Sequence, residues 1–381
     1  GLTSVNDVLI PKLKGLFALS YTEAMLTQFA FFTAYFIVSL PAGVLIARVG
    51  YVKGIVIGLV TMALGCLLFM PASTLGVYAM FLGALFVLAA GITILQVAAN
   101  PLIAQLGSAS TSHSRLTLAQ AFNSLGTTVF PPLGAMLILG STPGADDSTD
   151  VSIVGETYVA MALVLAAIAA FFWIRHRRLS LHGSETITLG GALPMLRRPR
   201  LGFGVAAIFV YVGAEVSIGS GLINYLTQPN VLGVSERTAG GLIAFYWGGA
   251  MLGRFLGAYL LTRFNPGSVL ASFAGGAVLL VSLSGLSQGW LAGYALLAVG
   301  LMNSIMFPTI FSLSVEGLGL RTPQGSGLLC MAIVGGALVP LLYGAVADAT
   351  SLSTALVVPT ICYLLICGYG WWARQPAADL T

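Results

Sequence analysis

Charged residues are scarce in this chain: Asp, Glu, Lys and Arg make up 7% of its 381 residues, whereas hydrophobic residues make up 57%. Soluble globular domains carry about 25% charged residues, because a water-exposed surface needs them. The shortage therefore excludes a soluble protein and predicts a protein embedded in the lipid bilayer. The formal net charge of +4 is small and spread along the chain, so it does not indicate binding to nucleic acid.

Side chains that build metal centres and catalytic sites are also few. The cysteines lie in apolar runs without metal-ligand spacing, and the histidines lie in segments that we expect to be cytoplasmic loops, which argues against a histidine proton relay. These residues are Cys66, Cys330, Cys362 and Cys367, and His113, His176 and His182. The segment GSASTSHS (107–114) has no nucleophile elbow, and the chain has no phosphate-binding glycine loop. We therefore expect no enzymatic activity, metal site or cofactor, and energy from an ion gradient rather than from nucleotide hydrolysis.

Long apolar runs fill most of the chain. A spanning helix needs about 20 mostly apolar residues, and the chain offers twelve candidate runs. They lie near 1–16, 22–47, 51–71, 76–106, 116–140, 157–175, 201–227, 238–262, 268–286, 289–313, 323–347 and 353–373. The first is short, since only ten residues precede Pro11, so we expect the sequence to begin inside a longer natural helix; no cleavable signal peptide is visible. The pattern predicts an all-α membrane protein with twelve transmembrane helices.

Basic residues collect on one side of these predicted spans. Twelve of the sixteen Lys and Arg fall there: Arg48, Lys53, Arg115, Arg175, Arg177, Arg178, Arg197, Arg198, Arg200, Arg263, Arg321 and Arg374. Lys12, Lys14 and Arg237 fall on the other side, and Arg254 lies inside a span. Cytoplasmic loops of membrane proteins carry an excess of Lys and Arg. This side, with both termini, is therefore predicted to be cytoplasmic, in a bacterial inner membrane.

The basic loop between the sixth and seventh spans divides the chain into two halves. We expect an N-terminal six-helix bundle over 1–175, a cytoplasmic linker over 176–200, a C-terminal six-helix bundle over 201–373 and a cytoplasmic tail over 374–381. Three motifs recur in the same order at a shift of about 210 residues, which predicts a parallel duplication with substrate held between the repeats. They are RVGYVKG (48–54) with RFNPGSV (263–269), NPLIAQLG (100–107) with FPTIFSLSVEGLG (307–319), and FPPLGAML (130–137) with VPLLYGAV (339–346).

Polar amides interrupt the fourth and fifth apolar runs at helical spacing. Gln96 and Asn100 are four residues apart, and Gln120 and Asn123 are three apart, so each pair shares one helix face. Amides in hydrocarbon are costly unless they meet partners or water. Two such pairs on consecutive spans predict half of a solute site. The alternative is hydrogen bonding between packed helices.

The chain resembles the fucose:proton symporter family of the major facilitator superfamily, most closely its glucose/galactose transporter branch. The motifs that carry the resemblance are VNDVLIP (5–11), FFTAYFIVSLPAG (31–43), LQVAANP (95–101), RLTLAQAFNSLGTT (115–128), YVGAEVSIGS (211–220) and FPTIFSL (307–313). The resemblance implies the major facilitator fold and a sugar transporter that rocks between inward and outward states. It places Asp7 at the family's protonatable aspartate and Asn123 at a sugar-site asparagine. Gln96 stands where the fucose transporters carry a second coupling glutamate, which puts a two-carboxylate proton relay in doubt.

Two carboxylates lie isolated in apolar runs. Burial of Asp7 in the first span makes it the first candidate for coupling; the alternative is a cap or an ion pair with Lys12 or Lys14. Glu215 lies in the seventh span, four residues after Tyr211 and on the same face. It could bind sugar hydroxyls together with the Tyr211 ring, bind a cation, or make a structural hydrogen bond to a neighbouring helix.

The remaining polar and aromatic candidates lie in the second half of the chain. Tyr246 and Trp247 are candidates for stacking on a sugar, with packing as the alternative, and Asn303 is a further candidate for sugar binding. Arg254 is expected to be structural and to pair with Glu316, either as a latch between conformations or as a packing contact.

We therefore expect a monomeric secondary transporter that imports a neutral, glucose- or galactose-like hexose with H⁺ or Na⁺. A transporter for another small polyol, a 6-deoxy sugar or a lipid-linked sugar is the alternative substrate reading. A membrane receptor or channel for a polar solute is the alternative from a different class.

Overall fold

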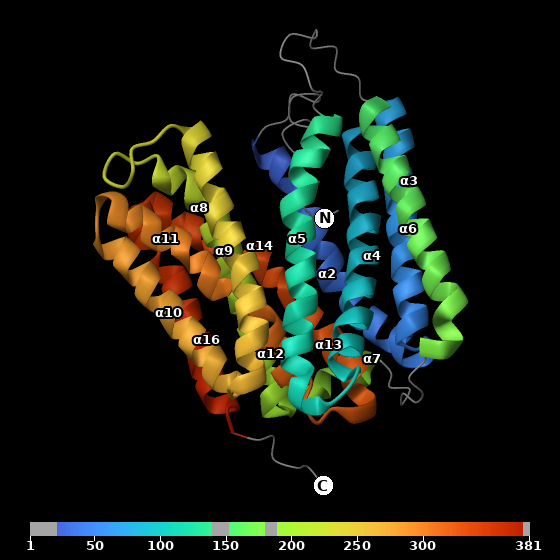
Figure 1. Ribbon diagram of the computed structural model, residues 1–381. Helices are drawn as coiled ribbons and strands as arrows, with labels where there is room; N and C mark the ends of the chain where they lie inside the picture. The colour runs from blue at the N-terminus through green and yellow to red at the C-terminus, as the bar shows by residue number, and fades with distance from the viewer. Residues whose placement is uncertain (1–20, 139–151, 180–188, 376–381) are drawn as a thin grey trace. The chain divides into compact units, whose positions relative to one another are not determined.

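The structure is a computed structural model that describes residues 21–138, 152–179 and 189–375. Within these ranges the chain is helical, and no β-strand occurs (Figure 1). The predicted first span, with Asp7, and residues 376–381 of the predicted tail lie outside the described residues.

Each predicted span from the second to the twelfth coincides with a helix or with two helices in succession. The single helices are α2 (Tyr21–Val49), α3 (Tyr51–Leu75), α4 (Tyr78–Gln105), α5 (Ser112–Ile138), α6 (Ser152–Leu179), α8 (Pro199–Leu226), α9 (Glu236–Arg263) and α10 (Pro266–Leu286). The pairs are α11 (Gly289–Asn303) with α12 (Met306–Val315), α13 (Thr322–Met331) with α14 (Gly335–Ala349), and α15 (Leu352–Ala355) with α16 (Val357–Ala373). In the described part of the chain, nine segments are long and apolar enough to cross a membrane.

Local sequence signals set the ends of several helices. Gly76 ends α3 in the left-handed conformation, at φ 62° and ψ 34°, which a residue without a Cβ adopts at little cost. The side chain of Ser235 caps α9 by accepting from the Thr238 N–H. The side chain of Asn265 caps α10 by accepting from the Ser268 N–H. These caps satisfy backbone N–H groups that the first helical turn leaves without partners.

Glycines let the helix backbones approach closely. A Cβ added at Gly65 of α3 would lie 2.5 Å from the Leu88 N of α4, and one added at Gly370 of α16 would lie 2.7 Å from the Ala271 N of α10. Both distances are too short for a real side chain. Glycines at such contacts therefore serve close helix packing of the kind found in membranes.

The chain forms two compact units. Unit 1 contains the described parts of 1–102, 125–192 and 320–331, and unit 2 contains 103–124, 193–319 and the described part of 332–381. Unit 1 thus includes α13 from the second half of the sequence, and the Ser326 Oγ of α13 donates to the Val97 carbonyl of α4 at 3.0 Å. Unit 2 includes the start of α5 from the first half. The predicted boundaries of two six-helix bundles stay a prediction.

Candidate functional site

The first predicted amide pair lies on α4 in unit 1. Gln96 is half-buried, and its Nε2 donates to the Tyr35 hydroxyl of α2 at 2.8 Å. Tyr35 is 2% exposed, and Phe31 packs against its ring with centroids 5.3 Å apart. Asn100, one turn further along α4, is buried. Tyr35 therefore orients the Gln96 amide while part of that side chain stays accessible.

The second predicted pair lies on α5 in unit 2. The Asn123 Nδ2 donates to the Gln120 Oε1 at 3.4 Å, as the spacing of three residues predicts. Asn123 is exposed and Gln120 is half-buried. Next to them, Phe122 packs edge-on against Phe255 of α9, with centroids 6.0 Å apart. Gln120 and Asn123 therefore share one face of α5, and the Phe122 ring beside them packs on α9.

A half-buried acid lies in the middle of α8. The Tyr211 hydroxyl donates to the Glu215 Oε1 at 2.8 Å and lies 3.2 Å from the Asn303 carbonyl, so its single hydrogen faces both acceptors. The prediction that Tyr211 and Glu215 share one helix face is confirmed. Because this phenol engages one carboxylate oxygen, Glu215 is held in a fixed position beside the end of α11.

Asn303, the last residue of α11, joins two tyrosines. Its Nδ2 donates to the Tyr246 hydroxyl of α9 at 2.8 Å, and its Oδ1 accepts from the Tyr363 hydroxyl of α16 at 2.7 Å. All three residues are fully buried. Asn303 and Tyr246, both predicted to meet sugar, thus lie behind the surface in this structure, whereas Trp247 is 44% exposed and packs edge-on against Tyr246.

Arg254 stabilises a break between two helices. The chain leaves α11 after Asn303 and enters α12 at Met306, which frees backbone carbonyls from their helical partners. The Arg254 Nε donates to the Ser304 carbonyl at 3.1 Å. The expected pair between Arg254 and Glu316 is absent from the described residues, because Glu316 lies at the far end of α12 and pairs elsewhere. Arg254 is thus structural, as predicted, but through the backbone.

A polar cluster that we call the basic-end latch consists of His113, Arg200, Ser312 and Glu316. The His113 Nδ1 lies 2.6 Å from the Ser312 Oγ, and its Nε2 lies 3.0 Å from the Glu316 Oε1. Arg200 pairs with the other Glu316 oxygen and donates to the Ala373 carbonyl at the end of α16. The prediction that His113 and His176 lie in loops is wrong: His176 lies in α6, and His113 is the second residue of α5 and is 5% exposed. The latch thus joins α5, α8, α12 and α16.

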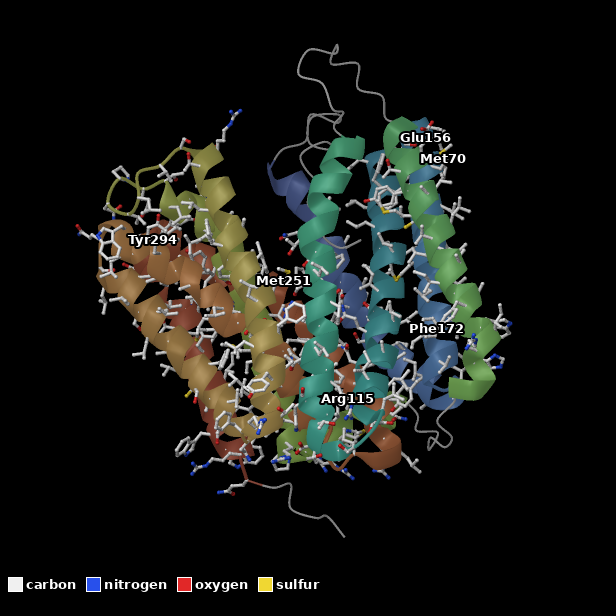
Figure 2. All side chains as sticks on the ribbon, viewed as in Figure 1. Met70, Arg115, Glu156, Phe172, Met251 and Tyr294 are labelled. Atoms are coloured by element: carbon white, nitrogen blue, oxygen red, sulfur yellow. The ribbon has the colours of Figure 1, made fainter. Side chains whose placement is uncertain are left out.

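Further contacts fix the start of α5. The Ser114 Oγ donates to the Ala258 carbonyl of α9 at 2.7 Å, and the Arg115 guanidinium donates to the Ala104 carbonyl near the end of α4 at 2.8 Å. Figure 2 shows Arg115 at the lower end of α5 and Tyr294 of α11 at the opposite end of unit 2. The latch therefore lies at the arginine-rich end of unit 2.

Sequence reasoning missed four residues of these clusters. Tyr35 and Tyr363 lie in apolar runs, where only their phenols distinguish them from packing residues. The available signal was that a buried tyrosine hydroxyl usually finds a partner. From the sequence, Arg200 counts only as one of the cytoplasmic charges, and His113 only as a loop residue. Their partners, Glu316 and Ser312, lie more than 100 residues away in the chain.

Asn303→Ala should destabilise the folded protein, because Asn303 is fully buried and its hydrogen bonds join helices. It leaves the Tyr363 hydroxyl without its acceptor and the Tyr246 hydroxyl with only the Glu215 carbonyl at 3.4 Å, in a fully buried site, which costs on the order of 1–3 kcal/mol. We expect a lower thermal unfolding temperature in detergent, measured by scanning fluorimetry. Trp247→Phe, at the exposed neighbouring position, serves as the control and should unfold like the parent. Equal unfolding temperatures for Asn303→Ala and the parent would show that the network adds no stability.

Comparisons with known proteins agree over nearly the whole chain. The Major Facilitator Superfamily profile matches residues 2–340. The chain is 50% identical to a glucose/galactose transporter of Brucella abortus over 97% of this chain and 90% of the relative, and 34% identical to the L-fucose-proton symporter of Escherichia coli over 99% and 90%. The crystal structure of the transporter FucP in the outward conformation matches with a TM-score of 0.87 at 32% identity, covering 98% of this chain and 95% of that one.

The family match and the structural match carry the same conclusion. A family profile over most of the chain and full-length relatives above 30% identity confirm the resemblance drawn from the sequence motifs. The TM-score of 0.87 confirms the fold class. The chain belongs to the Major Facilitator Superfamily, in the family of the fucose:proton symporters and glucose/galactose transporters.

Proposed function

We propose that this chain imports a neutral hexose of the glucose and galactose type together with a cation, by alternating access. The observation that carries the proposal is the 50% identity to the glucose/galactose transporter of Brucella abortus over 97% of this chain. Two pairs of amides on consecutive helices agree with it, because amides both donate to and accept from sugar hydroxyls. The match to a superfamily of transporters and to a glucose/galactose transporter agrees with the expectation that this chain is not an enzyme.

The accessible polar groups are the proposed sugar contacts. Gln96, Gln120 and Asn123 keep accessible surface, and the Trp247 ring offers an apolar face for the C–H groups of a sugar. The buried candidates then have a supporting role. Within unit 2, Tyr211, Tyr246 and Asn303 hold neighbouring helices together, and Tyr211 positions the Glu215 carboxylate; Asn100 is buried on α4.

Asp7 and Glu215 are the proposed coupling groups, with Glu215 as an alternative sugar ligand. A carboxylate in hydrocarbon is costly when charged, so its protonation favours the movements that bury it. A proton is the favoured cation, because the relative from Escherichia coli is an L-fucose-proton symporter; Na⁺ is the alternative. The amide at Gln96 leaves these two acids as the proposed carriers of the coupling charge.

The arginine-rich end is proposed to face the cytoplasm of a bacterial inner membrane. The excess of Lys and Arg on one predicted side supports this orientation, with both termini inside. We further propose that the protein works as a monomer, with two six-helix bundles over 1–175 and 201–373 that move against each other.

Transport by purified protein in vesicles tests this function directly. Labelled glucose, galactose and their epimers are offered while proton and sodium gradients are imposed independently. We expect uphill accumulation of a hexose that an uncoupler abolishes, which neither a receptor nor a channel can produce. Product formation without vesicle sidedness would instead indicate an enzyme.

A 6-deoxy sugar is the second candidate substrate. The 34% identity to the L-fucose-proton symporter of Escherichia coli over 99% of this chain favours it. Fucose in the same vesicle panel decides between the two: accumulation of fucose in preference to glucose and galactose would replace the main proposal. Another polyol or a lipid-linked sugar would appear as a failure of every free sugar to accumulate.

Gln96→Ala and Asn123→Ala should each weaken sugar binding while the protein stays folded. Each removes hydrogen bonds to a ligand hydroxyl that then stays unpaired, at a cost on the order of 1–3 kcal/mol. Binding of labelled sugar to protein in detergent measures the effect. Ser220→Ala, at an exposed hydroxyl bonded to its own helix, is the control and should bind like the parent. If both amide variants bind sugar like the parent, the site lies elsewhere.

A further inference from the structure

A narrow groove runs between α8 and α16 in unit 2. It has a volume of about 280 Å³ and is apolar over nearly all of its wall. It lies between two helices that pack side by side in this unit (Figure 1). The groove exists because small residues of both helices, Ala206, Ala207 and Gly368, do not fill the space between them. Larger apolar residues flank it: Phe203, Leu365 and Trp372.

The groove opens on the side of α16 that does not pack against α10. A Cβ added at Gly368 would meet no atom within 4 Å, whereas one at Gly370 would lie 2.7 Å from the Ala271 N of α10. Phe203 and Leu365 are each 58% exposed, although both are large and apolar. In a membrane protein such a face meets lipid chains. One water-sized group needs roughly 10–15 Å³ of such space, so a hollow of about 280 Å³ holds a chain of several methylene groups.

Two arginines lie close in the chain to the end of this groove where α8 begins and α16 ends. The α16 helix ends at Ala373, and the Arg374 guanidinium lies over the Trp371 ring at 3.6 Å. Arg197 precedes α8 and is exposed. Over the described ranges, no carboxylate lies within ion-pair distance of Arg197 or Arg374, whereas Arg200 is engaged by Glu316. An apolar channel that ends beside such cations matches a ligand with a long hydrocarbon chain and an anionic head.

We infer that the groove binds one acyl chain of an anionic phospholipid, with its phosphate beside Arg374 and Arg197. The site also touches the basic-end latch. Tyr369 lies along the groove, and its hydroxyl lies 3.0 Å from the Ser314 Oγ of α12 and 3.4 Å from the Arg200 carbonyl. A bound chain therefore braces the pairing of α8 with α16 next to the arginine that holds Glu316.

Lipid retention by the purified protein tests this inference without any use of sugar. Protein in detergent is mixed with phosphatidylglycerol or phosphatidylcholine, and native mass spectrometry counts the lipids that stay bound. Gly368→Leu and Ala206→Leu fill the groove from its two sides, and both positions are exposed, so the variants should fold. Gly344→Leu is the matched control, because a Cβ there also meets no atom within 4 Å but lies on α14, outside the groove.

We expect the parent and Gly344→Leu to retain one phosphatidylglycerol in preference to phosphatidylcholine, and both groove-filling variants to lose it. Arg374→Gln and Arg197→Gln should each lower the preference for phosphatidylglycerol by roughly fivefold. Retention like that of the parent in a folded Gly368→Leu or Ala206→Leu variant would overturn the assigned groove. Equal retention of both lipids by the parent would overturn the assigned headgroup. Neither result bears on sugar transport, so failure here is distinct from failure of the proposed function.

Discussion

Asp7→Asn should abolish uphill sugar uptake driven by a pH gradient while leaving sugar-for-sugar exchange in place. If Asp7 takes up and releases a proton in each cycle, a permanently neutral asparagine cannot couple the gradient to sugar movement. Exchange needs only the loaded carrier to move between its two states, and the neutral side chain permits that. The sign follows from electrostatics, since a charged carboxylate opposes closure into hydrocarbon and its neutral form does not.

Both transport modes are measured with labelled sugar in the same vesicle preparation, and Glu215→Gln is the matched comparison. If Glu215 binds sugar, this variant should lower affinity and keep its dependence on the cation. Unchanged accumulation by Asp7→Asn would remove Asp7 from the mechanism. Loss of cation dependence in Glu215→Gln, with affinity retained, would move the coupling role to α8.

The spans of the described chain follow from its sequence because their cause is local. An apolar run of membrane length has to satisfy its backbone hydrogen bonds internally, which makes it a helix. Capping signals of the same local kind, such as Asn265 as the N-cap and Pro266 as the first residue of α10, set the helix ends. The spacing of Tyr211 and Glu215 likewise fixes a contact, because residues four apart on one helix are neighbours.

The tertiary network could not be predicted in this way, because its partners lie far apart in the chain. Tyr363 and Asn303 are 60 residues apart, and His113 and Ser312 are 199 apart. Helical periodicity reports which residues share a face, but it does not report which other helix that face meets. The break between α11 and α12 was equally hidden, since the run 289–313 reads as one continuous span. The sequence therefore gives no sign that Arg254 donates to the Ser304 carbonyl at this break, and charge alone predicts Glu316 as its partner.

Glu316→Ala should shift the protein toward states in which the arginine-rich end is open. Glu316 receives the Arg200 guanidinium and faces the His113 Nε2, so the substitution removes the link between α5 and α8 and leaves the His113–Ser312 contact as the remaining link to α12. Hydrogen bonds to charged groups contribute about 1.5–3 kcal/mol, and each 1.4 kcal/mol is a factor of ten, so the open population should rise roughly 10- to 100-fold. A latch of this size also suits a carrier, which has to leave its closed state in every cycle.

A cysteine at position 117 reports the opening. Thr117 is fully buried on α5, and a Cβ added at Gly257 of α9 would lie 3.8 Å from its methyl group, so a thiol there becomes reactive only when α5 leaves α9. With the four native cysteines replaced, Thr117→Cys should react faster with a membrane-impermeant maleimide when Glu316→Ala is added. Glu236→Ala is the control. It removes one negative charge from an exposed position in the first turn of α9, at the end of that helix away from Gly257, and should leave the rate unchanged. A rate for Glu316→Ala equal to that of the parent would mean that the contacts of His113 with Ser312, and of Ser114 and Arg115 with backbone carbonyls, hold α5 in place without the carboxylate.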